Sequence, residues 1–171
     1  SKIVQPDVSV ITNINYAHAK NFKNLKQIAL AKSEIINNTK DNGFIILNAD
    51  DNFFTLHKKI AEQKNIKILS FGIKSKKSNI KLINIQKVGK KFKANIKINN
   101  LKTYFLISND FQSNIQNLLA ALTVMSIFFD ISKLSKNIFI NFKTPNGRGD
   151  ISKIKINNKK INLVDESYNS N

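Results

Sequence analysis

The sequence contains no cysteine and no tryptophan, and among its 171 residues there are only two prolines, five glycines and a single arginine. The absence of cysteine excludes disulfides and thiolate metal sites. The five glycines form no G-x-x-x-x-G-K-[ST] phosphate-binding loop. The longest apolar run, Leu118–Phe129, is interrupted by Thr and Ser and is too short to cross a bilayer. The residues given show no signal-peptide pattern, and we expect a reducing, cytoplasmic setting.

What is present fits one folded domain. Apolar residues make up 42% of the chain, which is enough to build a hydrophobic core at this length. The chain begins at Ser1 rather than at methionine, and it ends at Asn171 shortly after a strand-like run. We therefore expect it to be a piece of a longer protein.

The net charge of +17 allows two interpretations. It could mark an acidic partner, which would make the chain a basic nucleic-acid-binding module without catalysis. It could also reflect compositional drift, because all but one of the basic residues are lysine, and Lys, Asn and Ile dominate as in an AT-rich coding sequence. There is no clustered arginine with interleaved aromatics. We favour drift, and we expect neither nucleic acid nor a membrane as a partner.

Hydrophobic patterning in the first 72 residues predicts alternating strands and helices. Such a β-α-β-α-β order implies a parallel sheet covered by helices. The expected strands are Asp7–Ile14, Gly43–Asp51 and Ile66–Gly72, and the expected helices are Leu25–Asn37 and a second one over 51–63 that starts with an Asp cap.

The remaining pattern changes character. Residues 79–108 alternate apolar and polar with turn signals, which predicts an antiparallel meander of three strands with one wet face. Residues 110–130 are apolar nearly all round and predict a deeply buried helix. Residues 132–142 predict a second, weaker helix, 143–150 a loop, and 153–167 a hairpin whose last strand ends at Asp165.

Lys32 is the unusual residue of the first predicted helix. On a helical wheel it falls at the centre of the apolar stripe formed by Leu25, Ile28, Ala29, Ile35 and Ile36. Its stem could pack while its head reaches water. Alternatively, burial could lower the pKa of the amine, and a neutral amine can take up carbon dioxide to form a carbamate, an oxygen ligand for magnesium. The wheel alone favours the first explanation.

His18 lies in the loop after the first predicted strand. Ligands bind at the carboxyl ends of strands in open α/β sheets, so His18 could be a ligand. A loop histidine that bonds to backbone is the alternative, and taken alone it is the better supported one. His57, in the second predicted helix, is assigned no role.

Several linked stretches resemble the central ATPase domain of the Mur ligases. "PDVSVITNINYAHAKNFKNLKQIALAKSEI" followed by "GFIILNADD" is similar to the family's T-N-I, A-H, A-K-x-E-I and L-N-A-D-D motifs. "SNIQNLLAAL" resembles its H-N-x-x-N-A-L-A-A helix, with Ser113 in place of the histidine. "GRGDISKI" and "INLVDESYNSN" resemble its G-R-G and D-D-S-Y-N-A-N segments. The resemblance covers essentially the whole chain and is greatest for members that add D-alanyl-D-alanine.

The resemblance implies a fold and a division of the chain. The expected fold class is α/β: a P-loop-type, mostly parallel sheet flanked by helices, with a small antiparallel β-meander inserted at 79–108. Residues 1–164 would be a partial central ATP-binding domain that lacks the P-loop, and 165–171 the start of the linker to a C-terminal domain. The P-loop and an N-terminal domain would lie upstream, so this piece alone should be inactive.

The resemblance also implies a reaction. The parent would be an ATP-dependent amide ligase that joins D-alanyl-D-alanine to a UDP-N-acetylmuramoyl peptide through an acyl-phosphate, in peptidoglycan precursor synthesis. The cofactors would be ATP and Mg²⁺. Another Mur-type ligase or a polyglutamate-adding ligase is the alternative within the same fold.

Site residues follow from the resemblance position by position. His18 matches a magnesium ligand, and Lys32 matches a lysine that is carbamylated and helps to organise the metal. The residues that match nucleotide-binding positions are Asn114, Asn117, Arg148, Asp165, Tyr168, Asn169 and Asn171. Without the family, helix capping, a turn arginine and polar strand ends would account for these seven.

Overall fold

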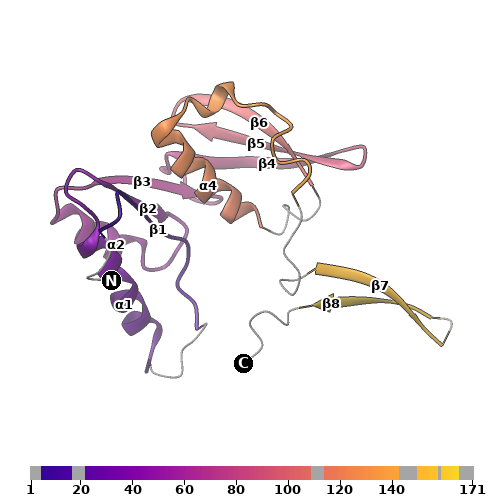
Figure 1. Ribbon diagram of the computed structural model, residues 1–171, viewed down its shortest axis with the longest axis horizontal. Coiled ribbons are helices and arrows are strands. Elements are labelled where there is room, and N and C mark those ends of the chain that lie inside the picture. The colour runs from indigo at the N-terminus through magenta and orange to yellow at the C-terminus, as the bar shows by residue number, and fades with distance from the viewer. Residues whose placement is uncertain (1–4, 17–21, 109–113, 143–149, 158, 166–171) are drawn as a thin grey trace.

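The computed structural model describes residues 5–16, 22–108, 114–142, 150–157 and 159–165. Its main body is a six-stranded mixed sheet in the order β1-β2-β3-β4-β5-β6 (Figure 1). The strands are β1 (Val8–Ile11), β2 (Phe44–Asn48), β3 (Lys67–Gly72), β4 (Ile80–Val88), β5 (Lys91–Ile98) and β6 (Leu101–Ile107). The helices are α1 (Leu25–Asn38), α2 (Phe54–Glu62) and α4 (Ile115–Phe128), with a short 3-10 helix η2 (Ile131–Lys133).

The first half is the predicted parallel β-α-β-α-β unit. β1 pairs with β2 and β2 with β3, all parallel, and α1 and α2 make the crossovers. α1 begins at the predicted residue because the Asn24 side chain caps it, accepting a hydrogen bond from the Gln27 N–H. At its far end the Thr39 hydroxyl lies 2.7 Å from that of Ser9, which fixes the helix against β1. α1 therefore runs back along β1, from the carboxyl end of the strand to its start.

The meander is confirmed, and it continues the main sheet. β4 continues the sheet by a short parallel pairing with β3, at Phe71–Ile80 and Gly72–Lys81. β5 and β6 then pair antiparallel. Gly89, with φ +61°, makes the β4–β5 turn, where a left-handed backbone favours glycine. One continuous sheet thus carries both halves of the chain.

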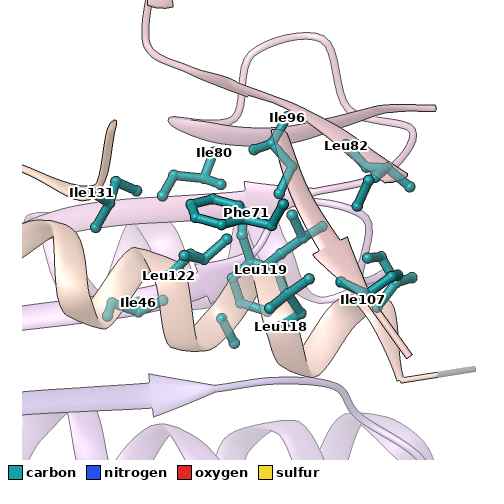
Figure 2. Close-up of a cluster of buried hydrophobic side chains, with 14 residues drawn as sticks. Ile46, Phe71, Ile80, Leu82, Ile96, Ile107, Leu118, Leu119, Leu122 and Ile131 are labelled. Carbon is teal, nitrogen blue, oxygen red and sulfur yellow. The ribbon is translucent and has the colours of Figure 1, made fainter. Parts of the chain in front are cut away.

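The sheet is covered on two faces because successive residues of a strand point to opposite sides. Ile45 and Leu47 of β2 face α1 and α2, whereas Ile46 faces α4. Figure 2 shows the second of these cores, in which Phe71 and the α4 leucines pack together. The members of that core drawn and named are Ile46, Phe71, Ile80, Leu82, Ile96, Ile107, Leu118, Leu119, Leu122 and Ile131.

Two predictions about the later helices were wrong in part. The predicted helix over 132–142 is not an α-helix, because its backbone turns to the free edge of β6: Leu106 N–H donates to the Lys136 carbonyl, and Phe139 bridges to Ile107. The fully buried residues of α4 end at Thr123, and Phe128 and Phe129 at the end of the helix are exposed. An apolar composition all round does not reveal which end of a helix the sheet covers.

The hairpin at the end of the described chain was predicted correctly. β7 (Asp150–Ile156) and β8 (Lys159–Asp165) form a separate two-stranded antiparallel sheet (Figure 1). Ile156, Ile161 and Leu163 of this hairpin are exposed. Among the residues that the structure describes, no helix is long and apolar enough to span a membrane.

Candidate functional site

The carboxyl ends of β1, β2 and β3 meet at one edge of the sheet, where ligands bind in open α/β folds. The segment that follows β2 supplies Asp50 and Asp51 to this edge, and the segment after β1 supplies Asn13 and Ile14. Lys32 reaches the same edge from α1. Residues that are far apart in the sequence therefore converge here.

Asp51 joins two of these segments. One carboxylate oxygen accepts from the Ile14 N–H at 2.8 Å, and the other accepts from the Phe53 N–H at 2.8 Å. The predicted Asp cap of the second helix is thus only partly right, because the N-cap position belongs to Phe53. The carboxylate fixes the loop after β1 to the start of α2.

Asp50 holds the segment that follows the carboxyl end of β3. Its carboxylate accepts from the backbone N–H groups of Ile73, Lys74 and Ser75, with the Ser75 bond at 2.7 Å. Asn48, itself buried, accepts from the Asp50 N–H at 2.9 Å. The two aspartates of the L-N-A-D-D motif are therefore tethers. Sequence reasoning gave Asp51 only the role of a helix cap and Asp50 none, and only the motif itself could have drawn attention to the tethers.

Lys32 agrees with the explanation that the helical wheel favours, in which its head reaches water, and not with a buried amine. It is exposed, not buried at the centre of the apolar stripe. α1 is rolled so that Ala29, Ser33 and Ile36 face the core. Ser33 tolerates burial because its hydroxyl donates to the Leu30 carbonyl at 2.6 Å. Lys32 therefore lies at the margin of the buried face.

The Lys32 amine is nevertheless held in place, since its Nζ donates to the Asn13 carbonyl at 2.9 Å. It lies at a hollow of about 360 Å³ between β1 and α1, lined also by Val10, Thr12 and Glu34. A carbamate formed on Nζ would keep one N–H, which could still donate to Asn13. The residues present therefore fit a carbamylated lysine at this position.

The predicted metal site can be followed only in part. His18 lies outside the described residues, two residues after Tyr16. Within the described part of the chain, no three His, Cys, Asp or Glu side chains cluster as metal ligands. Asp50 and Asp51 already accept backbone hydrogen bonds. Of the two predicted metal-site residues, His18 and Lys32, the structure therefore describes the surroundings of Lys32 alone.

The structure places Asn114 and Asn117 together at the start of α4, as the sequence predicts. Their side chains are linked at 3.5 Å, and Asn117 N–H donates to the Asn114 carbonyl at 3.0 Å. Asn114 occupies the N-cap position, but its side chain does not cap the helix. Simple capping therefore does not explain this residue.

Of the remaining predicted nucleotide-binding residues, the structure describes only Asp165. Asp165 is the last residue of β8, as expected, and pairs in register with Asp150. Four predicted residues lie outside the described residues: Arg148, Tyr168, Asn169 and Asn171.

His57 has a structural role between α1 and α2. It is buried, and its Nε2–H donates to the Ala29 carbonyl at 3.0 Å, which ties α2 to α1. This bond accounts for a buried polar side chain without any catalytic role.

Comparison with known proteins gives one family match and several related chains. Residues 1–125 match the family model described as the Mur ligase middle domain. The chain is 36% identical over 181 aligned residues to the UDP-N-acetylmuramoyl-tripeptide--D-alanyl-D-alanine ligase of Buchnera aphidicola from Acyrthosiphon pisum, covering 100% of this chain and 37% of that protein. It is 31% identical to the same-named protein of Buchnera aphidicola from Baizongia pistaciae, covering 100% of this chain and 36% of that one.

The fold of a solved structure agrees. The crystal structure of MurF ligase from Thermotoga maritima in complex with ADP matches with a TM-score of 0.78 and 24% identity, over 99% of this chain and 37% of that chain. At this identity the likeness shows the fold alone. The chain spans little more than a third of the length of the relatives that it matches.

Proposed function

The chain belongs to the Mur ligase family by its middle domain, and from this premise we propose that it is the central part of an ATP-dependent amide ligase. The proposed reaction joins D-alanyl-D-alanine to a UDP-N-acetylmuramoyl peptide. Support comes from the names of the relatives, which describe that ligation, and from the ADP complex of the structural neighbour. Residues 1–164 would form part of the central domain, and 165–171 would lead into the next one.

The chemistry required is phosphoryl transfer followed by acyl transfer. The terminal carboxylate of the muramoyl peptide attacks the γ-phosphorus of ATP, which gives an acyl-phosphate and ADP. The amine of D-alanyl-D-alanine then attacks the acyl carbon and phosphate leaves. Catalysis of such a transfer consists mainly of positioning and neutralisation of charge. Bound Mg²⁺ would supply part of that neutralisation.

The role of Lys32 would be to organise the metal. As a carbamate it would offer anionic oxygens, which magnesium prefers, and His18 would be a second ligand. The observation that carries this role is the hydrogen bond from Lys32 Nζ to the Asn13 carbonyl, because it fixes the amine beside the segment that leads to His18. Asp51 holds the next residue, Ile14, so it positions the same loop.

The nucleotide would lie toward the start of α4. Asn114 and Asn117 are neighbours there, and amide side chains offer both donors and acceptors to an adenine edge. Arg148 would contact the nucleotide, Asp165 the ribose, and the last predicted contacts are Tyr168, Asn169 and Asn171. The phosphate-binding loop would come from the upstream part of the protein.

The test uses the full-length protein and measures phosphate release that depends on both the muramoyl peptide and D-alanyl-D-alanine. Lys32→Ala should lower turnover sharply, and short carboxylates such as formate should restore part of it. Lys26→Ala, an exposed lysine on the same helix, is the matched control and should retain activity. Normal turnover of Lys32→Ala would contradict the metal-organising role. Activity with glutamate in place of the dipeptide would instead support the polyglutamate-adding alternative.

A further inference from the structure

The positive charge of the chain is concentrated in one segment. Residues 63–109 contain twelve lysines and no aspartate or glutamate, while the other residues share sixteen basic and eleven acidic side chains. Compositional drift raises lysine throughout a sequence, but it does not remove acidic residues from one segment and leave them elsewhere. The charge is therefore a local property of β3 and the meander, and it requires its own explanation.

The fold arranges part of this charge into a row. Lys81 of β4 lies opposite Lys97 of β5, and Lys97 lies opposite Lys102 of β6. Residues that face each other across strands have Cβ atoms about 5 Å apart, and like charges there are destabilising. The three described ion pairs involve Lys40, Lys58 and Lys133, so in the described part of the chain no carboxylate offsets this row.

The row lies on the face of the meander that points away from α4. The residues that alternate with it, such as Leu82, Ile96 and Ile107, are buried in the α4 core (Figure 2). We define the lysine face as Lys81, Lys93, Lys97, Lys102 and Tyr104. The β4–β5 hairpin carries three further lysines at its tip, Lys87, Lys90 and Lys91.

Tyr104 and exposed aliphatic side chains lie among these charges. The Lys93 ammonium lies 4.3 Å from the Tyr104 ring centroid, and Lys136 lies 5.9 Å from it. Ile83 and Val88 of β4 are about half exposed on this side of the sheet, at 45% and 52%. The surface therefore combines cations with apolar groups that can enter a membrane interface.

We propose that the lysine face docks this protein on a bilayer surface that carries anionic phospholipid. The charges spread across three strands in two dimensions, which suits a plane of headgroup phosphates better than the single line of a nucleic-acid strand. Residues 63–109 contain no arginine, the residue whose guanidinium forms bidentate hydrogen bonds with bases and phosphates. Lys93 covers the Tyr104 ring, which leaves less of it for base stacking. This inference replaces the expectation of no membrane partner, and it does not depend on the proposed reaction.

The experiment measures sedimentation of the full-length protein with vesicles of phosphatidylglycerol and phosphatidylcholine in equal parts, and with phosphatidylcholine alone. Each lysine near an anionic surface contributes roughly fivefold to binding, so Lys81→Gln, Lys97→Gln and Lys102→Gln together should weaken it roughly a hundredfold. The matched control carries Lys26→Gln, Lys58→Gln and Lys59→Gln, which removes the same charge from α1 and α2. Thermal unfolding checks that both proteins fold.

The proposal predicts binding that requires phosphatidylglycerol, weakens with added salt and is lost in the lysine-face protein but not in the control. Three results would overturn it: no binding of the wild-type protein to phosphatidylglycerol vesicles, equal loss in both triple variants, or tighter binding to duplex DNA at matched phosphate concentration. The last result would identify a nucleic-acid surface instead. None of these readouts depends on ligase turnover.

Discussion

Asp51→Asn is the sharpest test of how the loop after β1 is held. The carboxylate accepts one backbone hydrogen bond on each oxygen, from Ile14 and from Phe53, both at 2.8 Å. An asparagine of the same shape has one acceptor oxygen, so its NH₂ group would face a backbone N–H donor. Ile14 is buried, at 8% exposure, so an N–H that loses this oxygen would be left away from bulk water.

The expected change in amide exchange follows from the hydrogen bonds that the Asp51 carboxylate accepts. A hydrogen bond to a charged group contributes about 1.5–3 kcal/mol. Loss of about 2 kcal/mol from the local opening free energy would speed amide exchange roughly thirtyfold, since 1.4 kcal/mol corresponds to a factor of about ten. The assay is hydrogen exchange of the full-length protein, read by mass spectrometry on the peptide that contains Ile14. Asp41→Asn removes the same charge at an exposed site and should leave this peptide unchanged. Unaltered exchange in Asp51→Asn would refute the tether.

Three further predictions concern stability and titration. Gly43→Ala should destabilise the protein by about 1–3 kcal/mol in urea unfolding, because an added Cβ would lie 2.7 Å from the Asp7 carbonyl and 2.8 Å from that of Lys40. Lys97→Gln should raise stability by about 0.4–2 kcal/mol, since it removes two like-charge oppositions of roughly 0.2–1 kcal/mol each; unchanged stability would argue against repulsion in the row. The hydrogen bond and charge of Lys40 lower the pKa of Asp7. The stability that this ion pair contributes is present above the usual aspartate pKa, and it is lost as the pH falls through the lowered pKa of Asp7. Because Lys40 causes the shift, Lys40→Gln should raise the pKa of Asp7 in an NMR titration.

Much of the fold could be predicted because its signals are local. The strand at Ile66–Gly72 and the meander at 79–108 have the right hydrophobic period, and the structure confirms both within a few residues. The segment 132–142 failed because its apolar spacing fits a helix as well as a chain that follows a sheet edge. Pairing with β6 decided between them, and that partner lies about thirty residues away.

The site was harder to predict because it depends on tertiary contacts. A helical wheel shows that α1 has an apolar stripe, but the roll of the helix decides that Ser33 is buried and Lys32 is not. Asp50 and Asp51 read as polar residues at a strand end. Apart from Phe53, which follows Asp51 closely, their backbone partners lie 23 to 37 residues away, so the tethers become visible only once the three strand ends are placed side by side.

The central claim is that the amine fixed by the Asn13 carbonyl carries a carbamate. The direct measurement is ¹³C NMR of the full-length protein equilibrated with ¹³C-labelled carbon dioxide and magnesium. We predict a carbamate resonance that is present in the wild-type protein and in Lys26→Ala and absent in Lys32→Ala. A wild-type spectrum without that resonance, or one that persists in Lys32→Ala, would contradict the account.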